Sequence, residues 1–270
     1  MLRPGQIPLE CRAILSDMLW NRLNELFDSK GLARIRGLLD IWTHRQRAPC
    51  RREQEAIQDM FLPGLENDEP WLDANSFSFS VLLERAYPQI REEFEQLRTH
   101  SHFVPYTRGP HVPRNSPPIQ GLPPGWKEIK LIHEFEPVER NRTLAPTMSA
   151  IADQILAEHK VVAQFTILAL EPGTELPVHA DMANFLVSCH MGIEVPTECG
   201  LQVGAEKRSW LEGKCIAFNN SYLHSAFNHS SRMRYTLVVH TLHPNTTLTE
   251  RKALALIVST LKSMSVQSVP

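Results

Sequence analysis

The sequence has few cysteines, no excess of charge of either sign and no long apolar run. Its five cysteines are odd in number and scattered, and none forms a Cys-x-x-Cys pair. A disulfide framework and a thiolate zinc site are therefore not expected. The formal net charge is −2, so neither a nucleic-acid partner nor an acidic membrane surface is predicted from charge.

No stretch approaches the ~18 consecutive apolar residues that a membrane-spanning helix requires. The N-terminal segment MLRPGQIPLECRAILSDMLW contains Glu10 and Asp17 and lacks the uninterrupted apolar region of a signal peptide. We therefore expect a cytoplasmic protein with reduced thiols and no membrane contact. Hydrophobic residues make up 42% of the 270-residue chain and charged residues 21%, which is typical of a globular protein with a sizeable core.

The first third of the chain, up to roughly Thr99, has helical periodicity. The apolar pattern predicts three helices: about 8–28, one around Ile57, Met60 and Phe61, and about 80–97, where Pro88 starts or kinks the latter part. The following segment, 100–126, is rich in proline and poor in periodicity, which indicates a long loop. A binding loop and an inert surface linker are equally compatible with this composition.

Beyond a predicted helix over 145–159, the apolar period changes from 3.6 to 2. The alternation predicts strands over Val161–Leu170, Phe185–Glu194, Leu201–Val203, Lys207–Trp210, Cys215–Phe218 and Arg234–Leu242. Short strands joined by Gly/Pro turns favour an α+β fold with a jelly-roll or cupin-like core, a double-stranded β-helix. We expect one domain over 1–270, comprising a helical N-terminal buttress (1–99), the loop (100–126), the β core (127–244) and a C-terminal helix (245–270).

The tripeptide His179-Ala180-Asp181 places two metal-binding side chains two residues apart. On an extended strand, residues i and i+2 project from the same face, so this imidazole and this carboxylate can reach one ion. A second imidazole would come from His224, with His229 as a competitor. Two histidines and one carboxylate leave three octahedral positions open, which is typical of non-haem Fe(II) oxygenases. By itself the tripeptide is a weak signal.

Arg234 strengthens this interpretation. It follows His224 by ten residues and begins the apolar segment RYTLVVHTL, with Thr236 on the same face. A guanidinium that points inward from an apolar strand requires an anionic partner, because burying an unpaired charge is costly. A dicarboxylic cosubstrate would supply that anion, with a forked contact from Arg234 and a hydroxyl from Thr236. The ten-residue spacing favours His224 over His229 as the ligand.

Four segments carry a resemblance to a known family: LAPT (144–147), EPGTELPVHADMANFLVSCHMGI, WLEGKCIAFNNSYLHSAFN and RYTLVVHTLHP. They present, in order, P-x-T, P-G-T, His179, His190 eleven residues later, W-x-E-G-K, His224, Arg234 and H-P. This part of the chain, roughly Trp126–Pro244, resembles the aspartyl/asparaginyl β-hydroxylase family of 2-oxoglutarate oxygenases. The N-terminal third shows little detectable similarity.

The resemblance implies that the cofactors are Fe(II), 2-oxoglutarate and O2. It implies that His179 and His224 are iron ligands, and Asp181 completes the predicted triad. Arg234 would hold the distal carboxylate of 2-oxoglutarate, and His190 would contact the cosubstrate. The predicted cosubstrate-binding residues are Arg234, His190, Thr236 and Ser188. The implied reaction is hydroxylation of an unactivated C–H bond, with desaturation or ring closure as further outcomes.

The sequence also departs from the family pattern. The animal hydroxylase that names the family has Gly at the position of Asp181, so this chain is predicted to have a complete triad. Basic side chains in the strand before His190 are replaced by Leu186 and Ser188, and the usual F-D-D-S has become Phe218-Asn219-Asn220-Ser221. These changes argue against an aspartyl substrate and against EGF-like domains. We expect a small-molecule substrate, an amino acid or an amino-acid-derived metabolite.

Three other functions stay open. A hydroxylase of peptide or protein residues would use the Pro-rich segment as a binding loop. A cupin-like protein would bind a metal without turnover, and a metal-dependent isomerase or epimerase would not require O2. Among the remaining residues, we expect Trp210 to close a core, Asn184 and Asn220 to form turns, and His240 and His243 to have structural roles. The sequence does not indicate the oligomeric state.

Overall fold

The computed structural model describes residues 7–48, 60–65, 69–106, 125–133, 136–159, 162–181 and 183–266. The chain divides into two compact units. Unit 1 consists of Met1–Asp68, Met182–Phe185 and Asn245–Pro270, and unit 2 of Glu69–Asp181 and Leu186–Pro244. The predicted organisation of the whole chain as one domain stays a prediction. Within the described ranges, no helix is long and apolar enough to cross a lipid bilayer.

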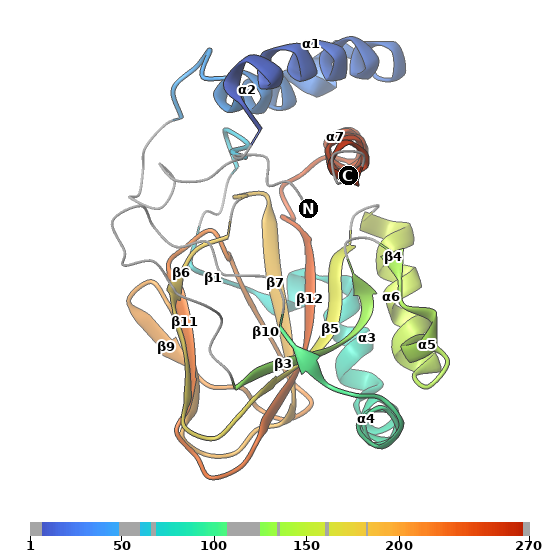
Figure 1. Cartoon of the computed structure of the whole chain (residues 1–270), viewed down its shortest axis with the longest axis vertical. Coiled ribbons are helices and arrows are strands. Elements are labelled where there is room, and N and C mark those ends of the chain that lie inside the picture. The colour runs from blue at the N-terminus through green and yellow to red at the C-terminus, as the bar shows by residue number, and fades with distance from the viewer. Residues whose placement is uncertain are drawn as a thin grey trace. The chain divides into compact units, whose positions relative to one another are not determined.

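Unit 2 contains two antiparallel β-sheets that face each other (Figure 1). The larger sheet has the order β1 (Trp71–Leu72), β10 (Cys215–Phe218), β7 (Leu186–Glu194), β12 (Arg234–Leu242), β5 (Val162–Leu170), β3 (Trp126–His133) and β2 (Val104–Pro105), and β4 (Glu136–Pro137) pairs with β3. The smaller sheet has the order β6 (Thr174–His179), β11 (His224–Asn228), β8 (Cys199–Val203) and β9 (Glu206–Arg208). The predicted α+β fold with a double-stranded β-helix core is confirmed.

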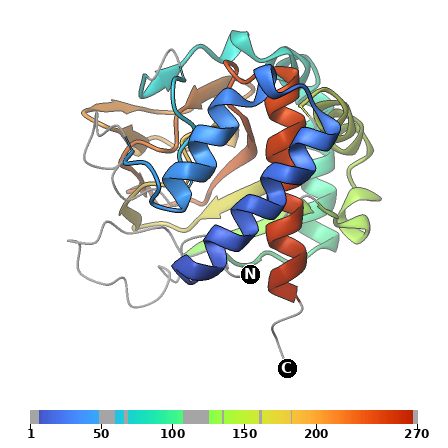
Figure 2. The ribbon, with the colours of Figure 1, turned by 90° about the horizontal axis from the view of Figure 1, so that it is seen from above.

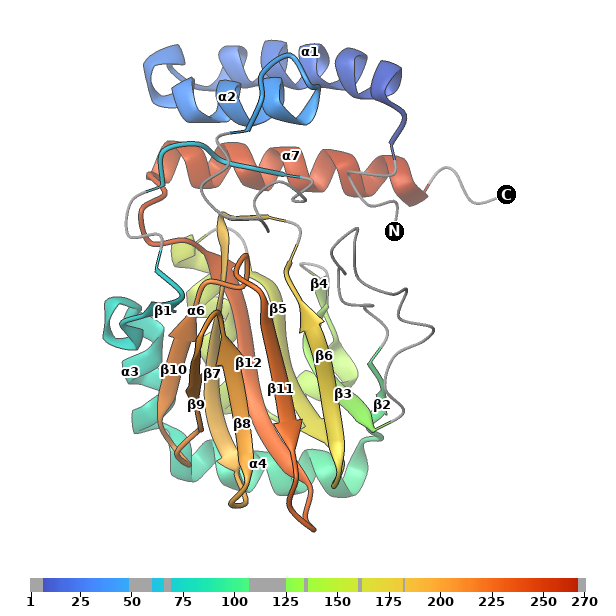
Figure 3. The same cartoon turned by 90° about the vertical axis from the view of Figure 1, so that its left-hand side faces the viewer.

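Side chains of the larger sheet alternate between its two faces, as the period of two requires. On β12, Leu237 and Val239 pack in one core with side chains of the helices, whereas Val238 belongs to a second core that lies between the sheets. Figure 3 shows the smaller sheet face-on, in front of the larger one. The larger sheet therefore buries both faces, and each apolar side chain that leaves water contributes roughly 1.5–3 kcal/mol.

The outer face of the larger sheet is covered by α3 (Ser78–Arg85), α4 (Tyr87–His100) and α6 (Pro146–His159), with the short helices η4 (Ala74–Ser76) and α5 (Glu139–Arg142) beside them. The predicted helix over 80–97 is thus two helices, because Pro88 lies in the first turn of α4 and cannot continue α3. Phe94 of α4 contacts Tyr235 of β12, with ring centroids 4.8 Å apart. The helical prediction for this part of the N-terminal third, and its packing on the sheet, is confirmed.

Unit 1 is helical. It contains α1 (Leu9–Leu26), η2 (Ser29–Leu32), α2 (Ala33–Trp42) and α7 (Leu248–Val266), and α2 contacts both α1 and α7 (Figure 2). The helices predicted over 8–28 and near the C-terminus are confirmed, whereas α2 was not predicted. The helix predicted around Ile57 is wrong for its described residues, because Met60 forms a β-bridge with Ala183. Ile57 itself, and most of the Pro-rich segment, lie outside the described residues.

An ion pair between half-buried Arg34 and buried Glu250 joins α2 to the start of α7. Arg34 makes a forked contact with Glu250, with Nε–Oε1 and Nη2–Oε2 distances of 2.7 and 2.6 Å. Glu250 also accepts the Thr247 N–H at 2.8 Å, while the Thr247 hydroxyl accepts the Glu250 N–H, which is the capping box of α7. Burial raises the pKa of Glu250, but the hydrogen bonds from Arg34 and Thr247 outweigh it, and the net pKa lies below the ordinary value.

We expect Glu250→Gln to lower the free energy of unfolding by about 3 kcal/mol at neutral pH, because it leaves the Arg34 guanidinium without its carboxylate. A lowered carboxyl pKa stabilises the fold above the unfolded pKa of about 4.3, and this contribution is lost as the pH falls through the folded value. The difference between the two proteins in urea unfolding should therefore shrink below about pH 4. Glu25→Gln, in the exposed Arg22–Glu25 pair, serves as the control and should change little. Equal stability of the Glu250 variant and wild type would contradict the assigned role.

Candidate functional site

Two histidines meet where β6 and β11 pair. His179 is the last residue of β6, His224 is the first of β11, and the two are register partners. Their ring centroids lie 4.1 Å apart. Together with Asp181 they offer one ligand atom each, and these atoms lie within 4.8 Å of one another. The residues predicted to form the triad are thus brought together, although β6 and β11 were not predicted as strands.

Both imidazoles are oriented in the same way. The Nδ1–H of His179 donates to the carbonyl oxygen of Pro177, and the Nδ1–H of His224 donates to that of Tyr222, each at 2.8 Å. This pairing fixes the tautomer and leaves each Nε2 with a lone pair for a metal. Burial, with the neighbouring His224, lowers the pKa of His179 to about 3, and burial lowers that of His224 to about 4. Both rings are therefore neutral at pH 7, the form that binds metals.

Asp181 does not lie on the strand that carries His179. Strand β6 ends at His179, so the prediction that all three residues of the tripeptide are extended is wrong. Contacts with Asn220 hold Asp181 instead: its N–H donates to the Asn220 carbonyl at 2.8 Å, and the Asn220 Nδ2–H donates to its Oδ2 at 2.6 Å. Asn220 was expected to form a turn, but it also orients the carboxylate and leaves the second oxygen of Asp181 for an ion.

A buried cation lies at the far end of the same pocket. Arg234 is 3% exposed, and its Nη1 donates to the Thr236 hydroxyl at 2.8 Å. The guanidinium carbon lies 4.6 Å from the ring centroid of Trp210. Burial lowers the pKa of Arg234 to about 10, so the side chain remains charged at pH 7. Its Nε has no hydrogen-bond partner among the described residues, so this buried donor is available to a ligand.

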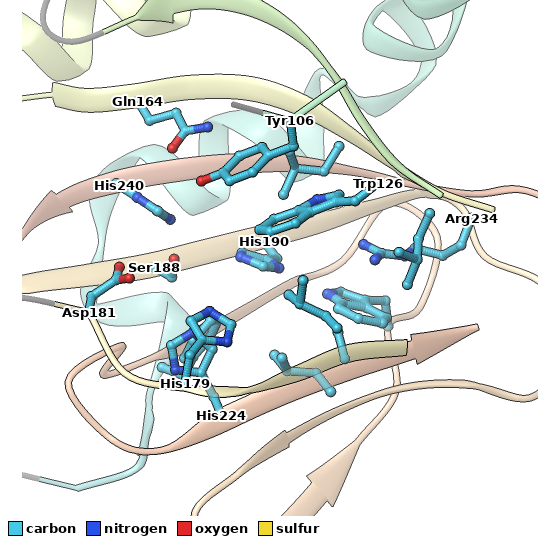
Figure 4. A pocket seen from close by; sticks show the side chains of 17 residues that line it. Tyr106, Trp126, Gln164, His179, Asp181, Ser188, His190, His224, Arg234 and His240 are labelled. Carbon is cyan, nitrogen blue, oxygen red and sulfur yellow. The ribbon is translucent and has the colours of Figure 1, made fainter. Parts of the chain in front are cut away.

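The middle of the pocket is formed by β7. Ser188 and His190 line the pocket, whereas Cys189 packs on the opposite side with the helix-facing core, as the alternation predicted. The His190 ring is parallel to that of Trp210, with 6.1 Å between centroids and 4° between planes. Burial lowers the pKa of His190 well below its ordinary value, so this imidazole is neutral. Figure 4 shows His190 between Ser188 and Arg234.

Part of the chain matches a known protein family. Residues 84–244, more than half of the chain, match the sequence profile of aspartyl/asparaginyl beta-hydroxylase. The chain belongs to the aspartyl/asparaginyl β-hydroxylase family. It is therefore a member of a family of hydroxylases, and the match begins well before residue 126, further toward the N-terminus than the motifs indicated.

Relatives in the family extend the similarity. Aspartate beta-hydroxylase domain-containing protein 2 of Mus musculus is 29% identical over 253 residues, covering 90% of this chain and 71% of the relative. The ornithine lipid ester-linked acyl 2-hydroxylase of Rhizobium tropici is 28% identical over 178 residues, covering 65% and 61%. Of solved structures, a predicted oxalate decarboxylase from Thermotoga maritima matches with a TM-score of 0.31 and 14% identity, covering 44% of this chain and 81% of that chain. The expectation that the N-terminal third has little similarity is wrong, since the mouse relative aligns along most of the chain.

Several pocket residues of this family member were not recognised as functional. Trp210 was expected only to close a core, yet it packs on the Arg234 guanidinium. His240 was expected to have a structural role, but it lines the pocket, as do Tyr106, Trp126 and Gln164, which the sequence did not single out. Tyr106 and Trp126 stack with 3.6 Å between centroids. A polar residue at an inward position of an apolar strand, as at Gln164, is the signal that could have identified one of them.

Two candidates from the sequence lie elsewhere. His229 is an exposed residue whose Nε2 contacts Glu175 at 2.7 Å, so the preference for His224 as the ligand agrees with the geometry. Asn184 belongs to unit 1, where its amide exchanges two hydrogen bonds with the backbone of Leu62. Neither residue is among those that line the pocket.

We expect Asn220→Ala to weaken Mn(II) binding by about 10–100-fold, because Asp181 would lose the donor that orients its carboxylate. Isothermal titration calorimetry of the metal-free protein would measure the change. Asn75→Ala removes an exposed asparagine of η4 whose side-chain amide donates to Asp73, and it should leave the affinity unchanged. An Asn220→Ala protein with wild-type Mn(II) affinity would show that Asp181 needs no such support.

Proposed function

We propose that this chain is an Fe(II)- and 2-oxoglutarate-dependent dioxygenase that oxidises an unactivated C–H bond of a small amino acid or amino-acid-derived metabolite. In this proposal His179, Asp181 and His224 hold the iron. Arg234 and Thr236 bind the distal carboxylate of 2-oxoglutarate, with His190 and Ser188 as further contacts. The observation that carries the proposal is the buried Arg234 cation in the pocket that contains the triad.

The donor set supports Fe(II). Two neutral imidazoles and one carboxylate bind on one face of an octahedral ion and leave the other three positions for exogenous ligands. The Nδ1 contacts to Pro177 and Tyr222 hold both rings in place before a metal arrives. This preorganisation matters because a ligand that had to reorient on binding would lower the affinity.

The chemistry of the far end supports a dicarboxylate. Arg234 is enclosed by the Trp210 ring and the Thr236 hydroxyl, and its Nε is available to a ligand. A carboxylate accepts a forked contact from a guanidinium, and the low dielectric of the site strengthens that contact. 2-Oxoglutarate has such a carboxylate at the end opposite its 2-oxo acid group, so Arg234 would hold that carboxylate while the 2-oxo acid group is directed toward the triad.

Bound Fe(II) and 2-oxoglutarate supply the oxidising power, because decarboxylation of the 2-oxo acid to succinate and CO2 is coupled to reduction of O2. The residues of this chain position the cosubstrate and exclude water. Arg234 sets the depth at which the cosubstrate binds, while Trp210 and Phe218 exclude water from the pocket. The fixed His179 and His224 rings keep the geometry constant through the reaction.

The scarcity of basic side chains in the pocket supports the substrate class. Leu186 and Ser188 stand where the family's aspartyl hydroxylase has basic side chains. Among the described residues that line the pocket, Arg234 is the sole lysine or arginine. With that cation assigned to the cosubstrate, an acidic aspartyl side chain has no counter-charge there, which supports a substrate of another kind.

Anaerobic addition of Fe(II) and 2-oxoglutarate to the metal-free protein should produce a weak visible charge-transfer band. His179→Ala should abolish the band because the metal loses a ligand. Arg234→Lys should raise the 2-oxoglutarate concentration for half-maximal band intensity by about tenfold or more, since lysine keeps the charge but not the forked contact.

Arg232→Lys is the matched control, because Arg232 is exposed and only two residues away. Its band should reach half-maximal intensity at the same 2-oxoglutarate concentration as that of wild type. A protein that binds Fe(II) but develops no band with 2-oxoglutarate would refute the proposal. A cupin-type metal-binding protein or a metal-dependent isomerase would then be the better account.

A further inference from the structure

Three polar side chains lie in a row across neighbouring strands of the larger sheet. His240 of β12 is the register partner of Gln164 on β5 and of Ser188 on β7. All three line the pocket, and Figure 4 shows them on one wall. We call Gln164, His240 and Ser188 the polar row. The cosubstrate assignment uses Ser188 but neither Gln164 nor His240.

The polar row and Arg234 lie at opposite ends of the pocket. His240 follows Arg234 by six residues on β12, which corresponds to roughly 20 Å along a strand. Figure 4 shows the polar row on the same side of the pocket as Asp181 and across the pocket from His179 and His224, with Arg234 at the other end. A group bound at the row would therefore face the metal-binding histidines across the pocket, while a dicarboxylate that reaches Arg234 extends the other way.

The side-chain oxygen of Gln164, Oε1, is buried without a hydrogen-bond donor among the described residues. The residue as a whole is 3% exposed. On the same face of β5, Leu168 and Leu170 are apolar and line the pocket. The Thr166 hydroxyl donates to the Ile129 carbonyl, so Gln164 differs in having a polar atom without a partner among the described residues. A buried carbonyl oxygen without a donor costs about 1–3 kcal/mol, so its presence in the pocket wall indicates a ligand that supplies the donor.

We propose that Gln164, flanked by His240, recognises the nitrogen group of the substrate by accepting an N–H hydrogen bond on Oε1. This inference rests on the proposed function, because it takes an amino-acid-type substrate as given. Such a substrate has an ammonium or amide nitrogen at one end and a carboxyl group at the other. Of the two, only the nitrogen supplies a donor. A carboxylate would leave Oε1 unpaired and would lie near the Asp181 carboxylate.

The experiment compares ligands that differ in their N–H donors. Standard amino acids are first titrated calorimetrically, without O2, into protein loaded with Mn(II) and saturated with 2-oxoglutarate. Each one that binds is then compared with its N,N,N-trimethyl counterpart, which keeps the positive charge and has no N–H. Wild type should bind the N–H form more tightly by on the order of tenfold or more.

Variants of Gln164 separate the hydrogen bond from steric effects. Gln164→Leu should reduce the preference to near unity, whereas Gln164→Glu, which retains an acceptor, should keep it. Gln202→Leu is the matched control, because Gln202 lies on β8 in the other sheet and its amide donates to the backbone of Gly204. All variants should bind 2-oxoglutarate with wild-type affinity.

Four results would overturn the inference. Trimethylated ligands could bind as well as their parents, or Gln164→Leu could keep the preference. Gln164→Leu could weaken 2-oxoglutarate binding as Arg234→Lys does, which would assign Gln164 to the cosubstrate. Finally, wild type could bind 2-oxoglutarate but no amino acid. Failure of wild type to bind 2-oxoglutarate is a different result, since it refutes the proposed function itself.

Discussion

Alternation of side chains along the central strands of the larger sheet is the constraint on which the site depends. Each of β5, β7 and β12 has helices on one face and the second sheet on the other, so residues of odd and even number have different surroundings. On β12 the helix-facing side chains Tyr235, Leu237 and Val239 pack in the core with the helices. The other face includes Arg234 and His240, with Thr236 and Val238 between them. One strand therefore carries both polar ends of a pocket while its other face holds the sheet to the helices.

The triad arises from a second, smaller constraint, which is the antiparallel pairing of β6 with β11. His179 and His224 are far apart in the sequence but are register partners, so their rings are held 4.1 Å apart by backbone hydrogen bonds. Burial keeps both imidazoles neutral, and carbonyl acceptors fix their tautomers. The metal-binding form is thus the resting form of the protein, and no proton has to leave either ring before a metal binds.

The buried charges of the molecule differ in how they are compensated. In unit 1, Arg34 and Glu250 neutralise each other, and the helix cap adds further hydrogen bonds. In unit 2, the Arg234 guanidinium contacts a hydroxyl and an aromatic face, and no carboxylate of the described residues is paired with it. A charge that is fully paired contributes to the fold, whereas one that is incompletely paired in a pocket favours a ligand of opposite sign.

Much of the site could be predicted because its chemistry is concentrated in short, ordered motifs. The period of two identified β5, β7, β10 and β12, and with them the inward directions of Arg234, Thr236, Ser188 and His190. The spacing between His224 and Arg234 led to the choice of His224 over His229. The helix around Ile57 was wrong where described, and α2 was missed, because apolar spacing in short segments does not exclude a bridge or a loop.

Other features depend on which distant segments meet, and no local pattern contains that information. Asn220 has the composition of a turn residue, and only the approach of Asp181 after the end of β6 makes it the donor to that carboxylate. Trp210 packs on the Arg234 guanidinium because the β9–β10 connection passes over Arg234. Gln164 and His240 form one polar row because the strand register aligns them. The sequence by itself determined the kinds of ligand atoms, the strand periodicity and the family. The tertiary structure alone decided which polar atoms are buried together and which of them are left for a ligand, because burial and hydrogen-bond pairing are set by contacts between residues distant in the chain.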